Sequence, residues 1–181
     1  MIKLKEPPRV KFFVGMIARD EKIMEEAILI LKEKIGEIEF ESDLFPFTHT
    51  NYYEKEMGKD LKRKFYSFKP LKKPDEIVDF KLFTIEVEKK FLEDNKRKIN
   101  IDPGYVELSK VVLASTKNYS HRIYLGKGIF AEVTLYFSKG EFCDFPYTYP
   151  DYRTEAYKEF FKKVRESLKK NYEKIKSCSC S

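Results

Sequence analysis

Residues 11–45 read KFFVGMIARDEKIMEEAILILKEKIGEIEFESDLF, and this stretch decides the class of fold. The apolar run at 11–17 is typical of a buried strand. Asp20 is a residue type that caps helices, and apolar side chains then recur at helical spacing until Gly36, a frequent helix terminator; they are Met24, Ala27, Ile28, Leu31 and Ile35. Apolar and charged residues alternate over 38–44, as in a half-buried strand. The stretch predicts strand, helix, strand.

The following segments continue a mixed order of helices and strands. Residues 65–71 form an aromatic-rich run that predicts a strand, and a proline at the first turn of 74–94 predicts a helix. A short strand at 99–101 precedes Asp102-Pro103-Gly104, which we interpret as a turn because proline fixes φ and glycine tolerates a positive φ. Strand character resumes at 111–115. This β-α-β-β-α-β order is that of a ferredoxin-like unit.

The segment HRIYLGKGIFAEVTLYF at 121–137 predicts an antiparallel hairpin closed by a three-residue turn at 126–128. One face of its second strand is expected to be apolar, with Ile129, Ala131, Val133, Leu135 and Phe137. The register places Arg122 opposite Glu132, close enough for a cross-strand ion pair. It also places His121 on the apolar face.

A turn at Lys139-Gly140 predicts a further strand, and a last helix is expected from about Thr154. Its core stripe is expected to contain Tyr157, Phe160, Phe161, Val164, Leu168 and Ile175. The predicted fold class is α+β, with a ferredoxin-like start extended by an antiparallel β-meander and a C-terminal helix. We expect one domain over 1–176 and a disordered Ser/Cys tail at 177–181.

Composition limits the classes of function. Charged residues are 36% of the chain and hydrophobic ones 42%, which suits a packed globule with a charged surface, and the Lys and Glu content is typical of a thermophile protein. The formal charge of +6 favours anionic partners, while its modest size gives only weak support for nucleic acid. Neither a secretory signal nor a membrane-spanning run is visible, so a cytoplasmic location without a membrane partner is expected.

Candidate site residues lie mainly between Asn100 and Arg153. We assign catalytic roles to Asp102, His121 and Glu132, and ligand binding to Lys117, Arg122, Arg153, Asp151, Tyr53, Glu56 and Arg63. The cations could neutralise phosphate oxygens, the carboxylates could hold Mg²⁺, and a histidine could carry a proton. The alternative is structural: Arg122 pairs with Glu132, Asp102 stabilises a turn, and His121 is a partly buried, hydrogen-bonded residue.

Two further groups were weighed for ligands. His49 with Glu54 and Glu56 could form a metal site, or these residues could belong to a solvated loop. Aromatic residues of the predicted strands could stack on unpaired bases or could pack in the core; they are Phe12, Phe65, Tyr66 and Phe68. Cys178 and Cys180 lack partner ligands for a soft metal. The phosphate-loop, dinucleotide-binding, zinc-protease and serine-hydrolase signatures do not occur in the sequence.

Several motifs together resemble a known family. They are YYEKEMG at 52–58, NIDPGYV at 100–106, STKNYSHRIYL at 115–125, AEVTL at 131–135 and YTYPDYR at 147–153. The chain is similar over about 11–170 to an uncharacterised bacterial family, a domain of unknown function with thermophile members. Some similar proteins carry the label GTP-binding protein, but the guanine-reading N-K-x-D motif does not occur in this chain.

The residues and the resemblance together lead to one function hypothesis and an alternative. The hypothesis is binding of a phosphorylated small molecule or nucleotide on the hairpin face, with metal-assisted chemistry as an option. The alternative is an RNA-binding or protein-interaction module without catalytic activity. The inventory of side chains fits an enzyme and a simple binder equally well.

Overall fold

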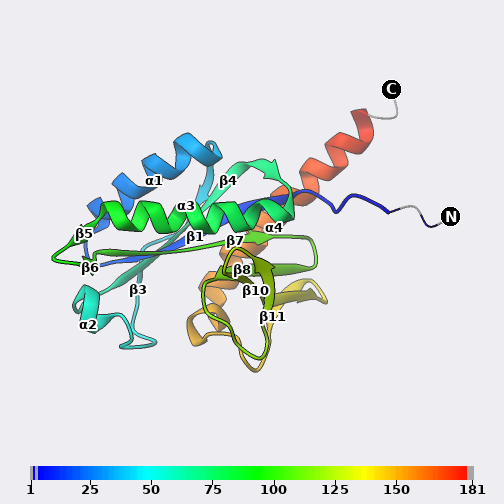
Figure 1. Cartoon of the computed structure of the whole chain (residues 1–181). Helices are drawn as coiled ribbons and strands as arrows, with labels where there is room; N and C mark the ends of the chain where they lie inside the picture. Colours follow the sequence, from blue (N-terminus) through cyan, green and yellow to red (C-terminus); the bar gives the residue numbers. More distant parts are fainter. Residues whose placement is uncertain (1, 3, 179–181) are drawn as a thin grey trace.

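The computed structural model describes residues 2 and 4–178, and within them the strands form one nine-stranded antiparallel sheet and a small hairpin (Figure 1). The main path of the sheet is β11-β10-β8-β7-β1-β4-β2, with β3 beside β4 and β9 beside β10. The strands are β1 (Val10–Ala18), β2 (Ile38–Glu41), β3 (Phe45–Pro46), β4 (Lys62–Lys72), β7 (Ile99–Val106), β8 (Lys110–Ser115), β9 (Ile123–Gly126), β10 (Ile129–Ser138) and β11 (Glu141–Asp144), and the hairpin is β5 (Leu92–Glu93) with β6 (Lys96–Arg97).

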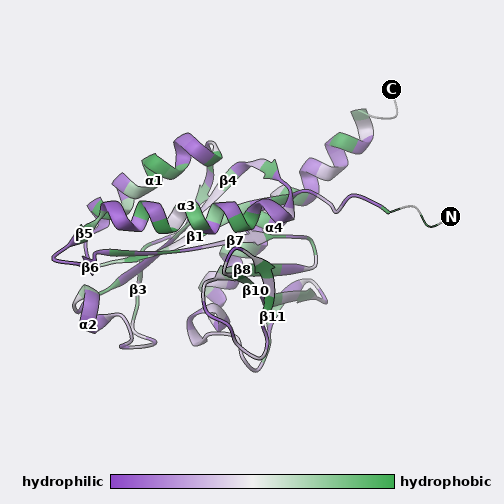
Figure 2. Ribbon diagram, in the orientation of Figure 1, coloured by the Kyte–Doolittle hydropathy of each residue, from purple (hydrophilic) through white to green (hydrophobic). Residues whose placement is uncertain are grey.

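Helices cover both faces of the sheet. Two lie on one face, α1 (Glu21–Ile35) and α3 (Ile77–Lys90), and α4 (Glu155–Cys178) lies on the other (Figure 1). The short elements are α2 (Glu54–Met57) and the 3₁₀ turns η1 (Pro74–Glu76) and η2 (Pro150–Arg153). Hydrophilic and hydrophobic residues alternate along the helices, as expected for helices that cover a sheet (Figure 2). The α+β class is therefore confirmed.

Strand β1 is the central element because it is buried along its whole length. Its alternate side chains enter two cores: Phe12 stacks on Phe80 of α3, and Phe13 meets Phe161 of α4. Each such aromatic side chain contributes about 1.5–3 kcal/mol through burial. The prediction of a buried strand at 11–17 is confirmed.

The first helix begins and ends where the sequence predicts. Asp20 accepts a hydrogen bond from the Lys22 amide at 3.0 Å, and Gly36 ends α1 with a φ of 124°. A side chain at Gly36 would also place its Cβ 2.4 Å from Pro70. Both the conformation and the close approach require glycine there.

Strand β7 corrects the prediction of a turn at Asp102-Pro103-Gly104. The strand runs through these residues, which pair with Gly15, Val14 and Phe13 of β1. The backbone of Ile101 points away from β1, because its amide donates to Glu88 and its carbonyl accepts from Lys81 of α3. Pro103 lies two residues after Ile101, so its backbone nitrogen also points away from β1. On that side β7 pairs with β8, and this pairing begins only at Gly104. The proline therefore interrupts no ladder bond.

The hairpin at 121–137 has a tighter turn than predicted. Gly126 pairs with Ile129, so Lys127 and Gly128 close the turn with φ values of 52° and 78°. A register shift then restores the expected pairing from Phe130 onwards. A second shift between Val133 and Leu135 reverses the faces of β10, which places Ile129 in the core under α1 and α3 and Leu135 in the core under α4. The prediction of a single apolar face over 129–137 was therefore wrong.

Of the two alternatives for the strand aromatics, core packing is confirmed, because all four are buried: Phe12, Phe65, Tyr66 and Phe68. In α4 the core stripe is as predicted from Tyr157 to Leu168, but Ile175 is exposed. This helix continues through Cys178, so two residues of the expected tail are helical and the rest lies outside the described residues.

The last turns of α4 extend past the sheet on the same side as the N-terminal segment (Figure 1). The Tyr172 hydroxyl donates a hydrogen bond to the carbonyl of Arg9, which ties the two together. Within the described part of the chain, helices of the length and apolarity needed to cross a bilayer are not found.

Candidate functional site

The face of the sheet that α4 partly covers carries a buried arginine between two carboxylates. Arg63 of β4 is 3% exposed; its guanidinium donates to Asp102 at 3.1 Å and to Asp151 at 3.2 Å. It reaches Asp102 by crossing β1 at Gly15, where an added Cβ would lie 2.7 Å from the Arg63 Nη1 atom. Glycine in β1 thus makes room for an ion pair between β4 and β7.

Buried polar atoms without partners gather around this arginine. Among the described residues, such atoms include Arg63 Nε, the Asn100 amide nitrogen and the hydroxyls of Tyr152 and Tyr157. Burial raises the pKa of Tyr157 to about 12 and that of Tyr152 well above its usual value, so both hydroxyls stay protonated at neutral pH. Buried donors of this kind are satisfied by water or by the oxygens of a ligand.

A second cluster lies on β10 and on the loop before β9. Glu132 is 2% exposed and accepts from the Nε2 atom of His121 at 2.8 Å and from the Nε atom of Arg122 at 3.0 Å. The ion pair predicted between Arg122 and Glu132 is therefore present. His121 does not lie on the predicted apolar face, because it bonds to Glu132 of the opposite face. It is partly buried and hydrogen-bonded, as the structural alternative predicts, and its ring stacks on Tyr147 with centroids 4.1 Å apart.

The carboxylate of Glu132 determines which nitrogen of His121 can react. It holds the hydrogen on Nε2, so Nδ1 carries the lone pair and is able to accept a proton. The Oε1 atom of Glu132 also accepts from Thr134 at 3.2 Å, which fixes the carboxylate in turn. The arrangement has the geometry of an oriented general base.

Lys117 connects this cluster to a segment far away in sequence. Its Nζ atom donates to the hydroxyl of Tyr52 at 2.7 Å, across 65 residues of chain. Arg122 donates to the carbonyl of Lys117 at 2.8 Å and to the hydroxyl of Tyr149 at 2.8 Å. The loops around Tyr52, Lys117 and Tyr149 therefore meet in one network.

We call this region the polar face and define it by Tyr52, Tyr53, Arg63, Asp102, Lys117, His121, Arg122, Glu132, Tyr149 and Asp151. Nearly all of the residues chosen from the sequence lie on it. Asp102 and Arg63 form its buried end, and Lys117 is exposed at its rim. Tyr53 lies beside them, and its pKa is raised by burial and then by the charge of Asp102.

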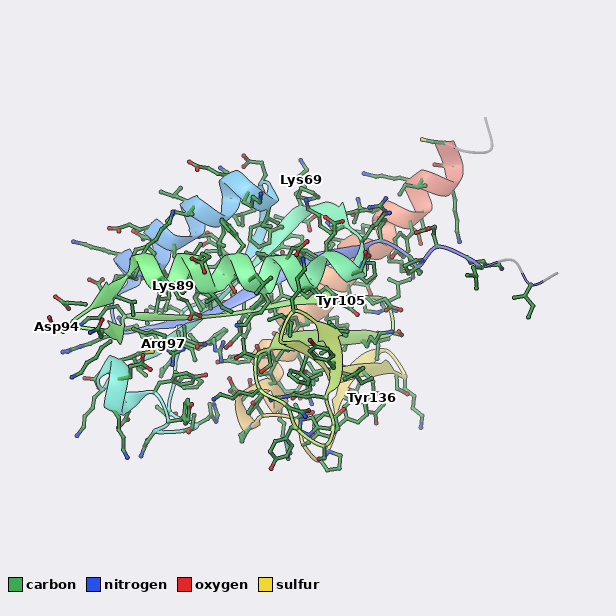
Figure 3. The ribbon with its side chains drawn as sticks, viewed as in Figure 1. Lys69, Lys89, Asp94, Arg97, Tyr105 and Tyr136 are labelled. Atoms are coloured by element: carbon green, nitrogen blue, oxygen red, sulfur yellow. The ribbon has the colours of Figure 1, made fainter. Side chains whose placement is uncertain are left out.

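Glu56 lies just outside the polar face and anchors its border. Arg97 donates to both carboxylate oxygens of Glu56, at 2.9 and 2.7 Å, and this hydrogen bonding lowers the Glu56 pKa. Arg97 also lies over the ring of Tyr53 at 5.9 Å. Arg97 lies near α2 and Asp94, at the end of the molecule opposite to the last turns of α4 (Figure 3). This bidentate pair ties α2 to the β5–β6 hairpin.

Arg153 does not join the polar face. Its guanidinium donates to the carbonyls of Thr148 at 2.8 Å and Pro146 at 2.6 Å, so it braces the loop before α4. Its nearest carboxylate is Asp144, at 3.9 Å. The Nε and Nη2 atoms of Arg153 are thus held by the loop, and its role as a ligand anchor stays a prediction.

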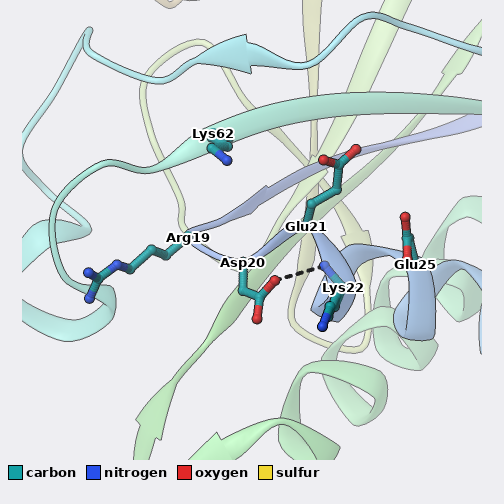
Figure 4. A pocket seen from close by; sticks show the side chains of 6 residues that line it. All are labelled: Arg19, Asp20, Glu21, Lys22, Glu25 and Lys62. Carbon is teal, nitrogen blue, oxygen red and sulfur yellow. Dashed lines mark hydrogen bonds between the residues drawn. The ribbon is translucent and has the colours of Figure 1, made fainter.

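The described part of the structure also contains two open hollows. One of about 670 Å³ surrounds the start of α1 and is lined by Arg19, Asp20, Glu21, Lys22, Glu25 and Lys62 (Figure 4). Another of about 430 Å³ lies along the segment from Leu44 to Lys62. In the first, basic and acidic side chains are balanced and Asp20 already caps the helix, so neither anions nor cations are favoured.

Metal binding receives no geometric support from the described residues. They contain no group of three or more His, Cys, Asp or Glu side chains placed to hold an ion. The grouping of His49 with Glu54 and Glu56 is thus not formed there. Asp102 and Glu132 each neutralise an arginine, which makes them poorer ligands for Mg²⁺.

Sequence reasoning did not select several residues that shape this region. Tyr149 was visible only as part of the YTYPDYR motif, and Gly15 only as a glycine inside an apolar run. A glycine in a central strand often marks close approach by another group, and here that group is Arg63. Arg97 carried no local signal, because its carboxylate partners come from α2 and α3, and Asn100 accepts a hydrogen bond from Arg97.

The contact between Lys117 and Tyr52 can be tested by titration. The hydrogen bond and charge of Lys117 lower the pKa of Tyr52, whereas burial raises those of Tyr53, Tyr152 and Tyr157. In an alkaline absorbance titration we expect Tyr52→Phe to remove the earliest ionisation phase. Lys117→Gln should move that phase to higher pH, since the neutral side chain no longer stabilises the phenolate. An unchanged first phase in both variants would contradict the contact.

The comparisons with known proteins point to one family. No curated protein matches the chain, and no solved structure does. A family model described as a domain of unknown function, DUF4416, matches residues 8–168. This range includes all five motifs on which the resemblance depends, as well as the whole polar face. The chain therefore belongs to the DUF4416 family.

Proposed function

We propose that the chain binds a phosphorylated small molecule at the rim of the polar face. The observation that carries the proposal is the contact of the Lys117 ammonium with the hydroxyl of Tyr52, which leaves the ammonium two further N–H donors. Arg122 joins the loop of Tyr149 to that of Lys117 through the Lys117 carbonyl. A phosphate group is the ligand that such donors favour in a protein of formal charge +6. His121, with its oriented Nδ1 atom, lies in the same network.

Charge compensation decides which cations can meet the ligand. Arg63 is neutralised by Asp102 and Asp151, and Arg122 by Glu132. Both arginines therefore support the site rather than contact the phosphate. Lys117 takes that role, which narrows the set of ligand-binding residues inferred from the sequence.

Thermal unfolding tests the proposal. The protein is tested against a panel of phosphorylated metabolites and nucleotides, with and without Mg²⁺. We expect one of them to raise the unfolding temperature by several degrees, since a ligand at about 100 times its Kd adds about 2.7 kcal/mol to the free energy of unfolding. Lys117→Gln should reduce this shift to roughly half, since a tenfold loss of affinity leaves the ligand at about 10 times its Kd, where it adds about 1.4 kcal/mol. Lys162→Gln, which removes an equal charge from the exposed side of α4, should keep it. The proposal fails if no compound stabilises the protein, or if both variants respond alike.

We also infer that β1, α1, β2, β4, α3 and β7 form a ferredoxin-like unit. The strand order β2-β4-β1-β7 with antiparallel neighbours supports this inference. In such a unit each β-α-β connection passes over one intervening strand. Here α1 connects β1 to β2 across β4, and α3 connects β4 to β7 across β1.

A further inference from the structure

The rim of the polar face offers three hydrogen-bond donors to one anionic group. The hydroxyl oxygen of Tyr52 accepts from Lys117, and that of Tyr149 accepts from Arg122. Each tyrosine therefore keeps its own O–H to donate. The Tyr52 hydroxyl and the remaining N–H groups of Lys117, whose Nζ atom is 2.7 Å from that hydroxyl, suit the oxygens of a single phosphate, and Arg122 links Tyr149 to the same loop through the Lys117 carbonyl.

A second or third phosphate would find no comparable partner on the polar face. The other cations of this face within the described chain are Arg63 and Arg122, and each is already paired with carboxylate. Asp102 is partly exposed and would repel an additional phosphate extending toward it. The charges thus favour a ligand with one phosphate group.

Exposed aromatic residues lie in the same segments as these donors. Tyr119 is 66% exposed and lies two residues after Lys117, with its ring 5.2 Å from that of His121. Tyr52 is 60% exposed and Tyr149 47% exposed. Exposed tyrosines next to a phosphate-binding cation are a recurring way to hold a nucleobase, because every base has a π-face on which a ring can stack.

We propose that the ligand of the polar face is a nucleoside monophosphate, with its phosphate at Lys117, Tyr52 and Tyr149 and its base on Tyr119. This inference rests on the proposed function and specifies its ligand. Lys117 sets the number of phosphates, because among the described residues it is the cation of the polar face without a carboxylate partner, and the exposed rings favour a planar group. A sugar phosphate lacks the planar group, and a nucleoside lacks the phosphate.

Calorimetric titration separates these ligands. We expect nucleoside 5′-monophosphates to bind at least about tenfold more tightly than the corresponding nucleosides, ribose 5-phosphate or nucleoside triphosphates. The triphosphates are tested with and without Mg²⁺. One charge-assisted hydrogen bond or one stacked base is sufficient for a factor of this size. Lys117→Gln should weaken monophosphate binding by about tenfold and leave nucleoside binding unchanged. Tyr119→Ser should weaken the monophosphate but not ribose 5-phosphate, and Lys162→Gln should change neither.

Each contrary result identifies what fails. Triphosphates that bind as tightly as monophosphates overturn the single-phosphate inference while leaving the proposed function intact. Ribose 5-phosphate that binds as tightly as a nucleoside monophosphate overturns the role of the base. If another class of phosphorylated compound binds in a Lys117-dependent way and nucleotides do not, the inference falls and the proposed function stands. If none of the phosphorylated compounds binds, both are wrong.

Discussion

Arg63→Met is expected to lower the free energy of unfolding by about 3–5 kcal/mol, the usual cost of removing one partner of a buried ion pair. The substitution leaves the buried carboxylate of Asp151 and the partly buried one of Asp102 facing each other without a counter-charge. For a chain of this length the unfolding temperature should fall by roughly 6–20 °C. Urea unfolding followed by circular dichroism, together with calorimetry, measures both quantities.

Two controls identify the cause of this loss. Adding Asp102→Asn and Asp151→Asn to Arg63→Met removes the uncompensated charges and should recover a large part of the stability. Arg9→Met removes an arginine whose carboxylate partner is 4.0 Å away at the surface, and should cost at most about 1 kcal/mol. If Arg63→Met lowers the free energy of unfolding no more than Arg9→Met does, the buried ion pair does not stabilise the fold as described.

Phe161→Ala is the second change with a large expected effect, about 3–5 kcal/mol, because it leaves a cavity in the core beneath α4. The Phe161 ring lies 4.8 Å from that of Phe13 and 5.3 Å from that of Phe65, and it stacks on Tyr152. Tyr152 directly follows Asp151, so the loss of packing also loosens the carboxylate that holds Arg63. Equilibrium urea unfolding measures the loss.

A neighbouring position on the same helix provides the matched control. Lys162 is exposed, so Lys162→Ala should change the free energy of unfolding by less than about 0.5 kcal/mol. The loss of unfolding free energy for Phe161→Leu should lie between those for Phe161→Ala and Lys162→Ala, since leucine keeps part of the buried volume. A cost for Phe161→Ala as small as that for Lys162→Ala would mean that α4 does not pack on the sheet as described.

Much of the local structure followed from sequence patterns because neighbouring residues decide it. The helical spacing from Met24 to Ile35 and the capping residue Asp20 fixed α1, and the stripe from Tyr157 to Leu168 fixed the buried side of α4. The pairing of Arg122 with Glu132 was also predictable, since both residues belong to one hairpin.

The predictions failed where a residue depends on a partner outside its own segment. Pro103 is a turn former locally, but β1 on one side and α3 on the other hold β7 extended through it. The faces of β10 reverse at Thr134 because its pairing with β8 shifts there, and pairing with another strand leaves no local pattern.

The sequence by itself determined the helices, most strands, the hairpin register and nearly all residues of the polar face. Tertiary structure alone decided how those residues meet: Arg63 reaches Asp102 across 39 residues of chain and Asp151 across 88, and Lys117 reaches Tyr52 across 65. The physical reason is that these contacts depend on the order of strands in the sheet and on the space above Gly15. Neither is encoded in the periodicity of any one segment.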